Sequence, residues 1–302
     1  LDEVRALCER CTVLRAGRVA GVVDARRETN DGLAALMLGA APPAAAARTA
    51  RAGDVALEVR GVSLAGAQPQ IDGPALAPVE LTVRAGEVVG IAGISGNGQG
   101  ALLDALSGEV RTGAGTVRLF GRDVSGEGVR RRRAAGLRTI PEERMGRGAV
   151  PGLSLAANTA LTRDELVTRG WLRRGRARDL AAALIERFGV KAEGPDATAG
   201  SLSGGNLQKL IVGREIDAGP RVLLVAQPTW GLDVGAAARI RRELTALADA
   251  GCAVLVISED LEELFEISDR LMVMAKGRLS PAVPVGEATI GQIGAWMGGV
   301  GL

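Results

Sequence analysis

The chain has 302 residues, 24% of them charged, and a formal net charge of +2. The length allows one large or two small domains. The balanced charge gives no global field that would draw the protein to nucleic acid, so we expect no nucleic-acid partner. The sequence contains no histidine, which excludes acid–base catalysis by that residue. A lone C-x-x-C at Cys8 and Cys11 is interpreted as a pair of small core residues, not as a redox or zinc site.

The first elements of the chain repeat near its end. Residues 1–21 match residues 261–281 without a gap, and identities continue in the same register beyond that span. Both copies predict a helix, a short strand ending at a Gly-Arg turn, and a closing helix. Because the second copy ends a complete module, we interpret residues 1–40 as the C-terminal remnant of another one, in an N-terminally truncated tandem protein. The Ala/Pro-rich segment 41–54 is typical of a linker.

The second module, residues 55–299, alternates short apolar strands with helices. In chain order the predicted elements are strands at 57–64, around Leu81 and at 86–93, helical sequence from about 155 to 218, a strand at 221–226, a helix at 235–250 and a strand at 252–258. Continuous apolar runs that alternate with helices predict a parallel sheet covered on both faces.

A glycine-rich loop follows the strand at 86–93. Its spacing resembles the phosphate-binding template G-x-x-x-x-G-K-[ST], with Gly93 and Gly98 at the glycine positions. Gln99 replaces the lysine that would contact the β- and γ-phosphates, and Gly100 replaces the hydroxyl residue that would bind Mg²⁺. The loop still offers backbone N–H groups that we expect to hold an anion weakly. These groups belong to Gly96, Asn97, Gly98, Gln99 and Gly100.

Four further segments complete a pattern that is similar to the ATP-binding cassette (ABC) ATPases. In chain order they are TIPEERMGRG at 139–148, SLSGGNLQK at 201–209, VLLVAQPTWGLD at 222–233 and ISEDLEE at 257–263. They stand where this family has its glutamine loop, its signature motif, its Asp-Glu-Pro-Thr strand with the following Asp loop, and its switch histidine. The combination of GNGQ, PEER, SGGNLQK and GLDVGA resembles the second cassette of double-cassette importers for simple sugars and nucleosides.

The resemblance implies a P-loop NTPase core with a parallel sheet, an N-terminal antiparallel β subdomain and an inserted α-helical subdomain at about 150–215. It also implies ATP as cofactor and a peripheral place at the cytoplasmic face of the membrane, on transmembrane permease subunits. A substrate-binding protein would be an indirect partner, and the first cassette an intramolecular one. Residues 149–161, which follow the loop of Glu142, are expected to meet a cytoplasmic helix of the permease.

The nucleotide site of this module is expected to be degenerate. Ala226 stands at the position of the metal-organising aspartate, Gln227 at that of the catalytic glutamate and Glu259 at that of the switch histidine. Loss of a general base alone lowers a rate by roughly 10²–10⁴-fold. We therefore expect the fragment alone to be inactive, with no metal held by its own residues. Glu142, near the glutamine position, and Asp233, in the Asp loop, stay candidate nucleotide contacts.

The signature motif, in contrast, is intact. A serine hydroxyl and glycine N–H groups at a helix start can contact a γ-phosphate, and here Ser203, Gly204, Gly205 and Asn206 open a predicted helix. In cassette dimers, as the resemblance implies, a signature acts on the nucleotide held by the opposite subunit. We therefore expect Ser203, Gly204 and Gly205 to act in trans in the working site of the missing first cassette. Mg²⁺ is expected at that partner site only.

Two other functions stay open for this sequence. A stand-alone, non-hydrolytic regulatory module that binds nucleotide or a partner fits the degenerate residues. A tandem cassette protein that acts on ribosomes is disfavoured, because the segment at 41–53 is short and nearly uncharged where such proteins carry a long charged linker.

A few conspicuous side chains have simpler interpretations. The arginines at 130–133 are typical of a solvated helix face. Trp171, Phe188 and Trp296 lie in apolar helical sequence and are expected to be core or subdomain-packing residues. Trp230 stands where the resembling sequences have arginine, and the sequence does not indicate its role.

Overall fold

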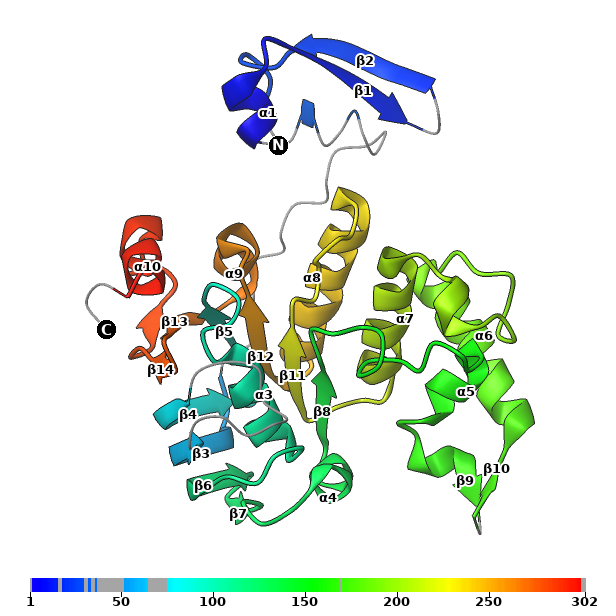
Figure 1. The fold of residues 1–302 in the computed structure, drawn as a ribbon, viewed down its shortest axis with the longest axis vertical. Helices are drawn as coiled ribbons and strands as arrows, with labels where there is room; N and C mark the ends of the chain where they lie inside the picture. Colours follow the sequence, from blue (N-terminus) through cyan, green and yellow to red (C-terminus); the bar gives the residue numbers. More distant parts are fainter. Residues whose placement is uncertain are drawn as a thin grey trace.

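The structure, a computed structural model, describes residues 2–15, 18–29, 32, 33, 36, 52–64, 75–168 and 170–299. Its N-terminal region forms helix α1 (Asp2–Leu7) and an antiparallel hairpin of β1 (Arg10–Arg15) and β2 (Arg18–Asp24) (Figure 1). The same order recurs in α9 (Leu261–Ile267) and β13 (Arg270–Ala275), and β13 begins 260 residues after β1. The repeated sequence thus takes the same local structure twice.

The N-terminal cysteines are not core residues, so that interpretation was wrong. Cys8 is exposed and Cys11 is half-buried, whereas Cys252 is buried in the core of the second module. Cys8 lies in the short connection between α1 and β1. Cys11 lies on β1, which pairs with β2 alone among the described strands, so that this small sheet leaves its side chains largely uncovered. Most of the predicted linker at 41–54 lies outside the described residues.

An antiparallel sheet opens the region that begins at Val55. Its strand order is β4 (Leu76–Arg84), β3 (Val55–Leu64), β6 (Ala114–Leu119) and β7 (Arg122–Asp123). β3 and β4 bury side chains in near alternation, the pattern of a sheet with one face on a core. This sheet is the predicted antiparallel β subdomain.

The central sheet is mostly parallel and joins strands from both halves of the region 55–299. Its order is β14 (Arg278–Leu279), β13, β5 (Val88–Ala92), β12 (Ala253–Ser258), β11 (Val222–Ala226) and β8 (Leu137–Ile140), with β15 (Val283–Pro284) paired to β13. β5, β11 and β12 bury every residue, because helices or the antiparallel sheet cover both faces.

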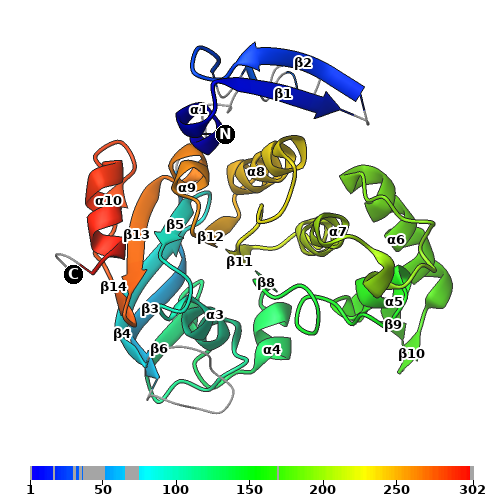
Figure 2. The ribbon, with the colours of Figure 1, turned by 45° about the horizontal axis from the view of Figure 1, so that its top comes forward.

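Two hydrophobic cores fill the space on either side of this sheet. One core joins it to α3 (Gln99–Ser107) and the antiparallel sheet. The other joins it to α7 (Gly204–Asp217), α8 (Val234–Asp249) and α9, and α10 (Ile290–Met297) packs at its edge. Figure 2 shows α3 and the pair α8 and α9 on opposite sides of the strands. The fold is the P-loop NTPase arrangement that the motifs predicted.

The inserted subdomain is helical, but it also contains a small hairpin. After α5 (Leu155–Ala160) a single turn leads to β9 (Val167–Thr168) and β10 (Trp171–Leu172), and α6 (Arg174–Phe188) follows. Phe188 is 2% exposed, as expected of a core residue, and Trp296 packs partly buried against the second core. Trp171 is 81% exposed, so its assignment to the core was wrong.

The arginines at 130–133 do not form a uniformly solvated face. They lie in α4 (Val129–Ala134), where Arg132 is only 1% exposed. Its guanidinium donates to the carbonyl oxygens of Ala105 and Leu106 at 2.8 Å each and to that of Glu127. The last carbonyls of α3 lack partners within their own helix, and a buried cation there satisfies them.

Candidate nucleotide site

The glycine loop joins β5 to α3 at the carboxyl edge of the central sheet. Gly96 and Gly98 have φ angles of 81° and 110°, in the left-handed region that favours glycine. A Cβ on Gly93 would lie 2.6 Å from the backbone carbonyl oxygen of Met274, which cannot move aside as a side chain can, so this position favours glycine. Beside the loop lies a cavity of about 700 Å³, a volume typical of small-molecule sites.

The Gln99 side chain is folded back into its own loop. It is 7% exposed, its Oε1 accepts a hydrogen bond from the Asn97 N–H at 3.0 Å, and its Nε2 donates to the carbonyl of Ile94 at 2.8 Å. One N–H of the predicted anion nest is therefore already occupied by a neutral amide. A phosphate that used this N–H would have to displace the side chain.

Asn97 fixes the loop to the turn between β13 and β14. Its side-chain oxygen accepts from the backbone N–H of Lys276 at 2.8 Å, and its backbone carbonyl accepts from the N–H of Gly277. The Lys276 ammonium lies near Gly299, about 3.5 Å from where a Cβ there would stand, and does not line the cavity. Lys276 thus supports the loop through a backbone hydrogen bond, and its positive charge does not reach the cavity.

The residues at the positions of the metal-organising aspartate, the catalytic glutamate and the switch histidine lie at the carboxyl ends of β11 and β12. Ala226 is nearly buried and offers no oxygen ligand in its side chain. Gln227 has a φ of 48°, unusual for a residue other than glycine, and its Oε1 accepts from the Glu259 N–H at 3.3 Å. With Gly100 also lacking a hydroxyl, these residues do not fit a Mg²⁺ ion, which prefers oxygen ligands.

Most of the sequence-predicted residues come together here, and some do not. The residues from that set that line the cavity are Gly93, Gly96, Gly98, Gln99, Gly100, Glu142, Ala226, Gln227 and Glu259, whereas Asn97 does not line it. Asp233 does not line it; it caps α8, where its carboxylate accepts from the Ala236 N–H at 2.8 Å. The signature residues 203–206 also lie outside its lining.

The signature opens a well-formed helix. Ser203 is the N-cap of α7, and its hydroxyl accepts from the backbone N–H of Asn206 at 3.4 Å and from its side-chain amide at 3.0 Å. Ser203 and Gly204 are exposed, and Gly205 and Asn206 are half-buried. The start of α7 is thus a preformed and accessible group of donors.

Comparison with known proteins decides the family. The sequence model described as "ABC transporter" matches residues 76–230, which is just over half of the chain. The chain belongs to the ABC transporter family. Among solved structures it is similar to a dimeric ATP-binding cassette in a post-hydrolysis state with ADP and phosphate. The TM-score is 0.66 at 20% identity, over 76% of this chain and 98% of that one.

Curated relatives match almost the whole chain. It is 37% identical to the nucleoside import ATP-binding protein NupA of Lactococcus lactis subsp. cremoris, over 99% of this chain and 59% of that protein. It is 39% identical to the glucose import ATP-binding protein TsgD13 of Haloferax volcanii, over 100% of this chain and 55% of that protein. The chain therefore spans somewhat more than half the length of these relatives.

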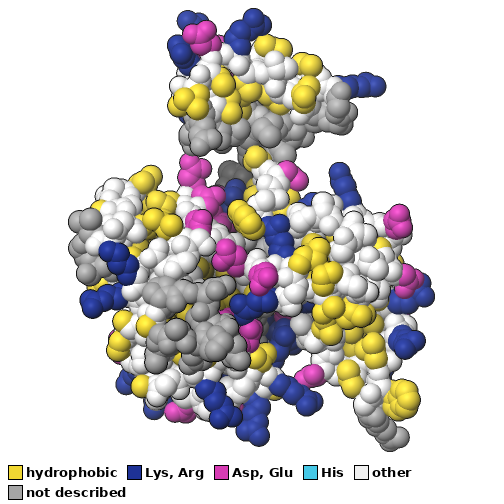
Figure 3. All heavy atoms as spheres, viewed as in Figure 1, with side chains coloured by type: hydrophobic (Ala, Val, Ile, Leu, Met, Phe, Trp, Pro, Cys, Tyr) yellow, Lys and Arg dark blue, Asp and Glu magenta, His cyan; other side chains and the backbone are white. Residues whose placement is uncertain are grey.

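The cavity of this ABC domain carries an excess of negative charge. Its acidic lining residues are Asp104, Glu109, Glu142, Glu143 and Glu259, against Arg144 and Arg147. Burial raises the pKa of Glu142, and the negative charge of Glu259 raises it further. Figure 3 shows acidic side chains gathered near the middle of this face, beside arginines. Such a lining opposes a polyphosphate, whose own charge is negative.

Both arginines of the cavity are already engaged. Arg147 forms ion pairs with Asp104, at 2.5 Å, and with Glu109. Arg144 donates to the side-chain oxygen of Gln208 at 3.1 Å and to the carbonyl of Trp230, and its guanidinium lies 5.2 Å from the Trp230 ring centre. Little free positive charge is left for a phosphate.

Arg144 and Gln208 join three motifs of this ABC domain, a link that sequence reasoning missed. Gln208 is 1% exposed on α7, and its amide donates to the carbonyls of Gln227 and Pro228 at 3.3 and 3.1 Å. With Arg144 it connects the PEER loop, the signature helix and the segment around Trp230. The arginine of PEER and the glutamine of SGGNLQK were visible signals, but their contact depends on the tertiary fold.

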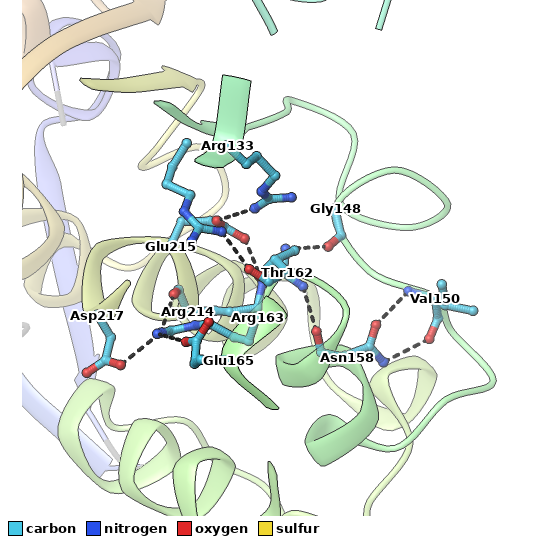
Figure 4. A network of polar contacts seen from close by, with 11 residues as sticks. Arg133, Gly148, Val150, Asn158, Thr162, Arg163, Glu165, Arg214, Glu215 and Asp217 are labelled. Atoms are coloured by element: carbon cyan, nitrogen blue, oxygen red, sulfur yellow. Dashed lines mark hydrogen bonds and ion pairs between the residues drawn. The ribbon is translucent and has the colours of Figure 1, made fainter. Parts of the chain in front are cut away.

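The other end of α7 is fixed by a buried ionic network, which Figure 4 draws. The Arg214 guanidinium pairs with Glu215 at 2.8 Å and donates to the carbonyls of Gly148 and Asn158 at 3.0 Å. Arg133 closes the network on Glu215 at 2.6 Å, and these two cations hold the pKa of the Glu215 carboxyl below its usual range despite burial. The signature helix is thereby tied to Asn158 in the segment at 149–161 and to Gly148, which directly precedes it.

Proposed function

We propose that this chain is the ATP-binding, energy-coupling part of an ABC importer for simple sugars or nucleosides. The observation that carries the proposal is its similarity along nearly the whole chain to import ATP-binding proteins. Their names specify nucleoside, guanosine, glucose, ribose and arabinose. No helix in the part of the chain that the structure describes is long and apolar enough to cross a membrane. We propose that the chain is a peripheral subunit that binds the permease at the cytoplasmic face of the membrane.

We further propose that the glycine-loop site of this cassette binds ATP poorly and does not hydrolyse it. The support is the folded-back Gln99, the absence of an oxygen ligand at Ala226 and Gly100, and the amide at Gln227. The acidic lining adds electrostatic repulsion. In this proposal Mg²⁺ and hydrolysis belong to the site of a first cassette, which is the intramolecular partner.

The contribution of this chain to that working site is its signature. Ser203 presents a hydroxyl at the start of a 14-residue helix, and the following glycine backbones are accessible. A donor group of this kind that contacts the γ-phosphate in the transition state contributes roughly 10²–10³ to a rate. The repeated α1–β1 and α9–β13 units, and relatives of which this chain spans 55–59% of the length, support a tandem arrangement.

The segment at 149–161 is the proposed contact with the permease. Val150 and Leu153 expose 40% and 37% of their surface, and Leu161 exposes 55%. Asn158 in the same segment is fully buried and makes four hydrogen bonds to the backbone of residues 150–154. An apolar surface on a rigid support suits a partner helix.

Cysteine cross-linking tests this function. Single cysteines from 150 to 158, in a background without Cys8, Cys11 and Cys252, are paired with cysteines in the cytoplasmic loops of the permease encoded with this chain. We expect cross-links at the exposed positions Val150 and Leu153 and none at the buried Asn158. An assembled, transport-active complex that gives no cross-link anywhere in the segment would contradict the proposed contact. Failure of the chain to co-purify with any such permease would contradict the importer function itself.

A further inference from the structure

The hairpin β9–β10 ends in an exposed apolar tip. Trp171 is 81% exposed, and the cross-strand partners Val167 and Leu172 expose 46% and 39%. Figure 1 shows the hairpin projecting from the lower edge of the helical subdomain, and Figure 3 shows hydrophobic atoms at the same place. Three exposed apolar side chains on one small hairpin form a patch of the kind that marks a contact with a partner.

Positive charge follows the tip directly. Arg173, Arg174 and Arg176 are exposed, and none of them forms an ion pair with a described residue. They stand at the start of the 15-residue α6, whose first turn contains no acidic residue. Cations there oppose the helix dipole and weaken the helix, so folding does not explain them.

Acidic groups near the tip do not neutralise these arginines. Asp164 and Glu165, in the turn before β9, lie within ion-pair distance of Arg130 and Arg163. Further along α6, Arg178 pairs with Asp196 at 2.5 Å. The three arginines at 173, 174 and 176 are therefore available to an anionic partner that also accepts an indole and a leucine.

We propose that this tip inserts into the headgroup region of an anionic lipid bilayer. Tryptophan is enriched at the membrane–water interface because its ring is apolar and its N–H is polar. Each arginine near an anionic leaflet adds electrostatic attraction to the lipid phosphates. In this arrangement Trp171 and Leu172 lie at the boundary with the acyl chains, and the arginines contact phosphates beside them. The contact requires neither nucleotide nor permease, so it goes beyond the function proposed above.

Tryptophan fluorescence with vesicles tests the insertion. The purified chain with Trp230→Phe and Trp296→Phe retains Trp171 alone, and the matched chain with Trp171→Phe and Trp296→Phe retains Trp230, which is 64% exposed. We expect emission from Trp171 to shift to the blue with phosphatidylcholine vesicles that contain phosphatidylglycerol, and high salt to reverse the shift. Emission from Trp230 is expected to stay unchanged. No shift of Trp171, or an equal shift with phosphatidylcholine alone, overturns the proposal.

A charge-matched pair of variants tests the arginines. Substitution of Arg173, Arg174 and Arg176 by alanine should lower vesicle partitioning roughly 10²-fold, from the loss of three interfacial cations. The control, with alanine at the exposed Arg18, Arg111 and Arg242, removes the same charge elsewhere and should bind like the parent chain. Equal loss in both variants would mean that overall charge, not the tip, drives binding. If Trp171 responded only in a permease complex and never to bare vesicles, its partner would be protein and the lipid proposal would be wrong.

Discussion

Removing the Gln99 side chain should increase the affinity of this cassette for ATP. The amide now closes the glycine loop through two hydrogen bonds, from the Asn97 N–H at 3.0 Å and to the Ile94 carbonyl at 2.8 Å. A bound phosphate competes with the first of these bonds, and the side chain must leave for the nest to open. In Gln99→Ala the nest is open before the nucleotide arrives.

The size of the effect follows from the two bonds. A neutral hydrogen bond contributes about 0.5–1.5 kcal/mol net, so displacing the amide costs about 1–3 kcal/mol. That range corresponds to an affinity gain of roughly 5–150-fold in Gln99→Ala. Gln99→Lys should bind more tightly still, because a charge-assisted contact adds about 1.5–3 kcal/mol. Gln99→Glu should bind more weakly than the parent, since it adds a negative charge to an already acidic cavity.

Isothermal titration calorimetry with ATP measures this series. We expect affinity to rise in the order Glu, Gln, Ala, Lys at position 99. Gln292→Ala, on α10 and outside the cavity, serves as a control that should leave affinity unchanged. If Gln99→Ala bound ATP no better than the parent chain, the amide would be a ligand for the phosphate and not a competitor, and the reasoning would be refuted.

Two further predictions concern stability. Arg214→Ala leaves Glu215 and two backbone carbonyls poorly satisfied in a buried network, so urea unfolding should show a loss of about 3–5 kcal/mol. The exposed Arg187→Ala should cost less than about 1 kcal/mol, and equal losses would contradict the network's role. Burial raises the pKa of the Glu263 carboxyl from 4.5 to about 7, and the nearby charge of Asp260 raises it further. Hydrogen bonds from Ser258 and Thr229 and the charge of Arg241 act in the opposite direction and lower it. Because the folded carboxyl holds its proton to a higher pH than the unfolded one, stability falls as pH rises from 4.5 to about 7, by about 3 kcal/mol. Glu263→Gln should abolish that fall in pH-dependent urea unfolding; an unchanged slope would mean that another group causes it.

The sequence predicted the fold well because the decisive signals are local. β5, β11 and β12 bury both faces and therefore appear as unbroken apolar runs. The motifs between them keep their order and spacing, so one assignment fits the whole module. The motif residues that line the cavity follow from that assignment, since the carboxyl ends of parallel strands share one edge of the sheet.

The errors and omissions all depend on tertiary contacts. The hairpin at Trp171 has two residues in each strand, too few to show a period of two, and its apolar sequence was mistaken for a buried helix. Arg132 belongs to a run of arginines, and only the position of the α3 carboxyl end explains its burial. The motif showed that Gln99 replaces a lysine, but not that its side chain folds back into the loop, because that conformation depends on the loop geometry.

ATP turnover tests most directly the proposal that a tandem protein containing this chain would have one working site. In a protein that joins this chain to a first cassette, Ser203→Arg should abolish turnover, because it blocks the signature that faces the working loop. Ser201→Arg, two residues earlier and also exposed, should be tolerated, and Gln99→Ala should change turnover little. The expected contrast between Ser203→Arg and Gln99→Ala is at least ~10²-fold, the scale of losing one transition-state donor. Equal losses in these two variants would contradict a single working site, because the loop of this chain would then have to take part in hydrolysis.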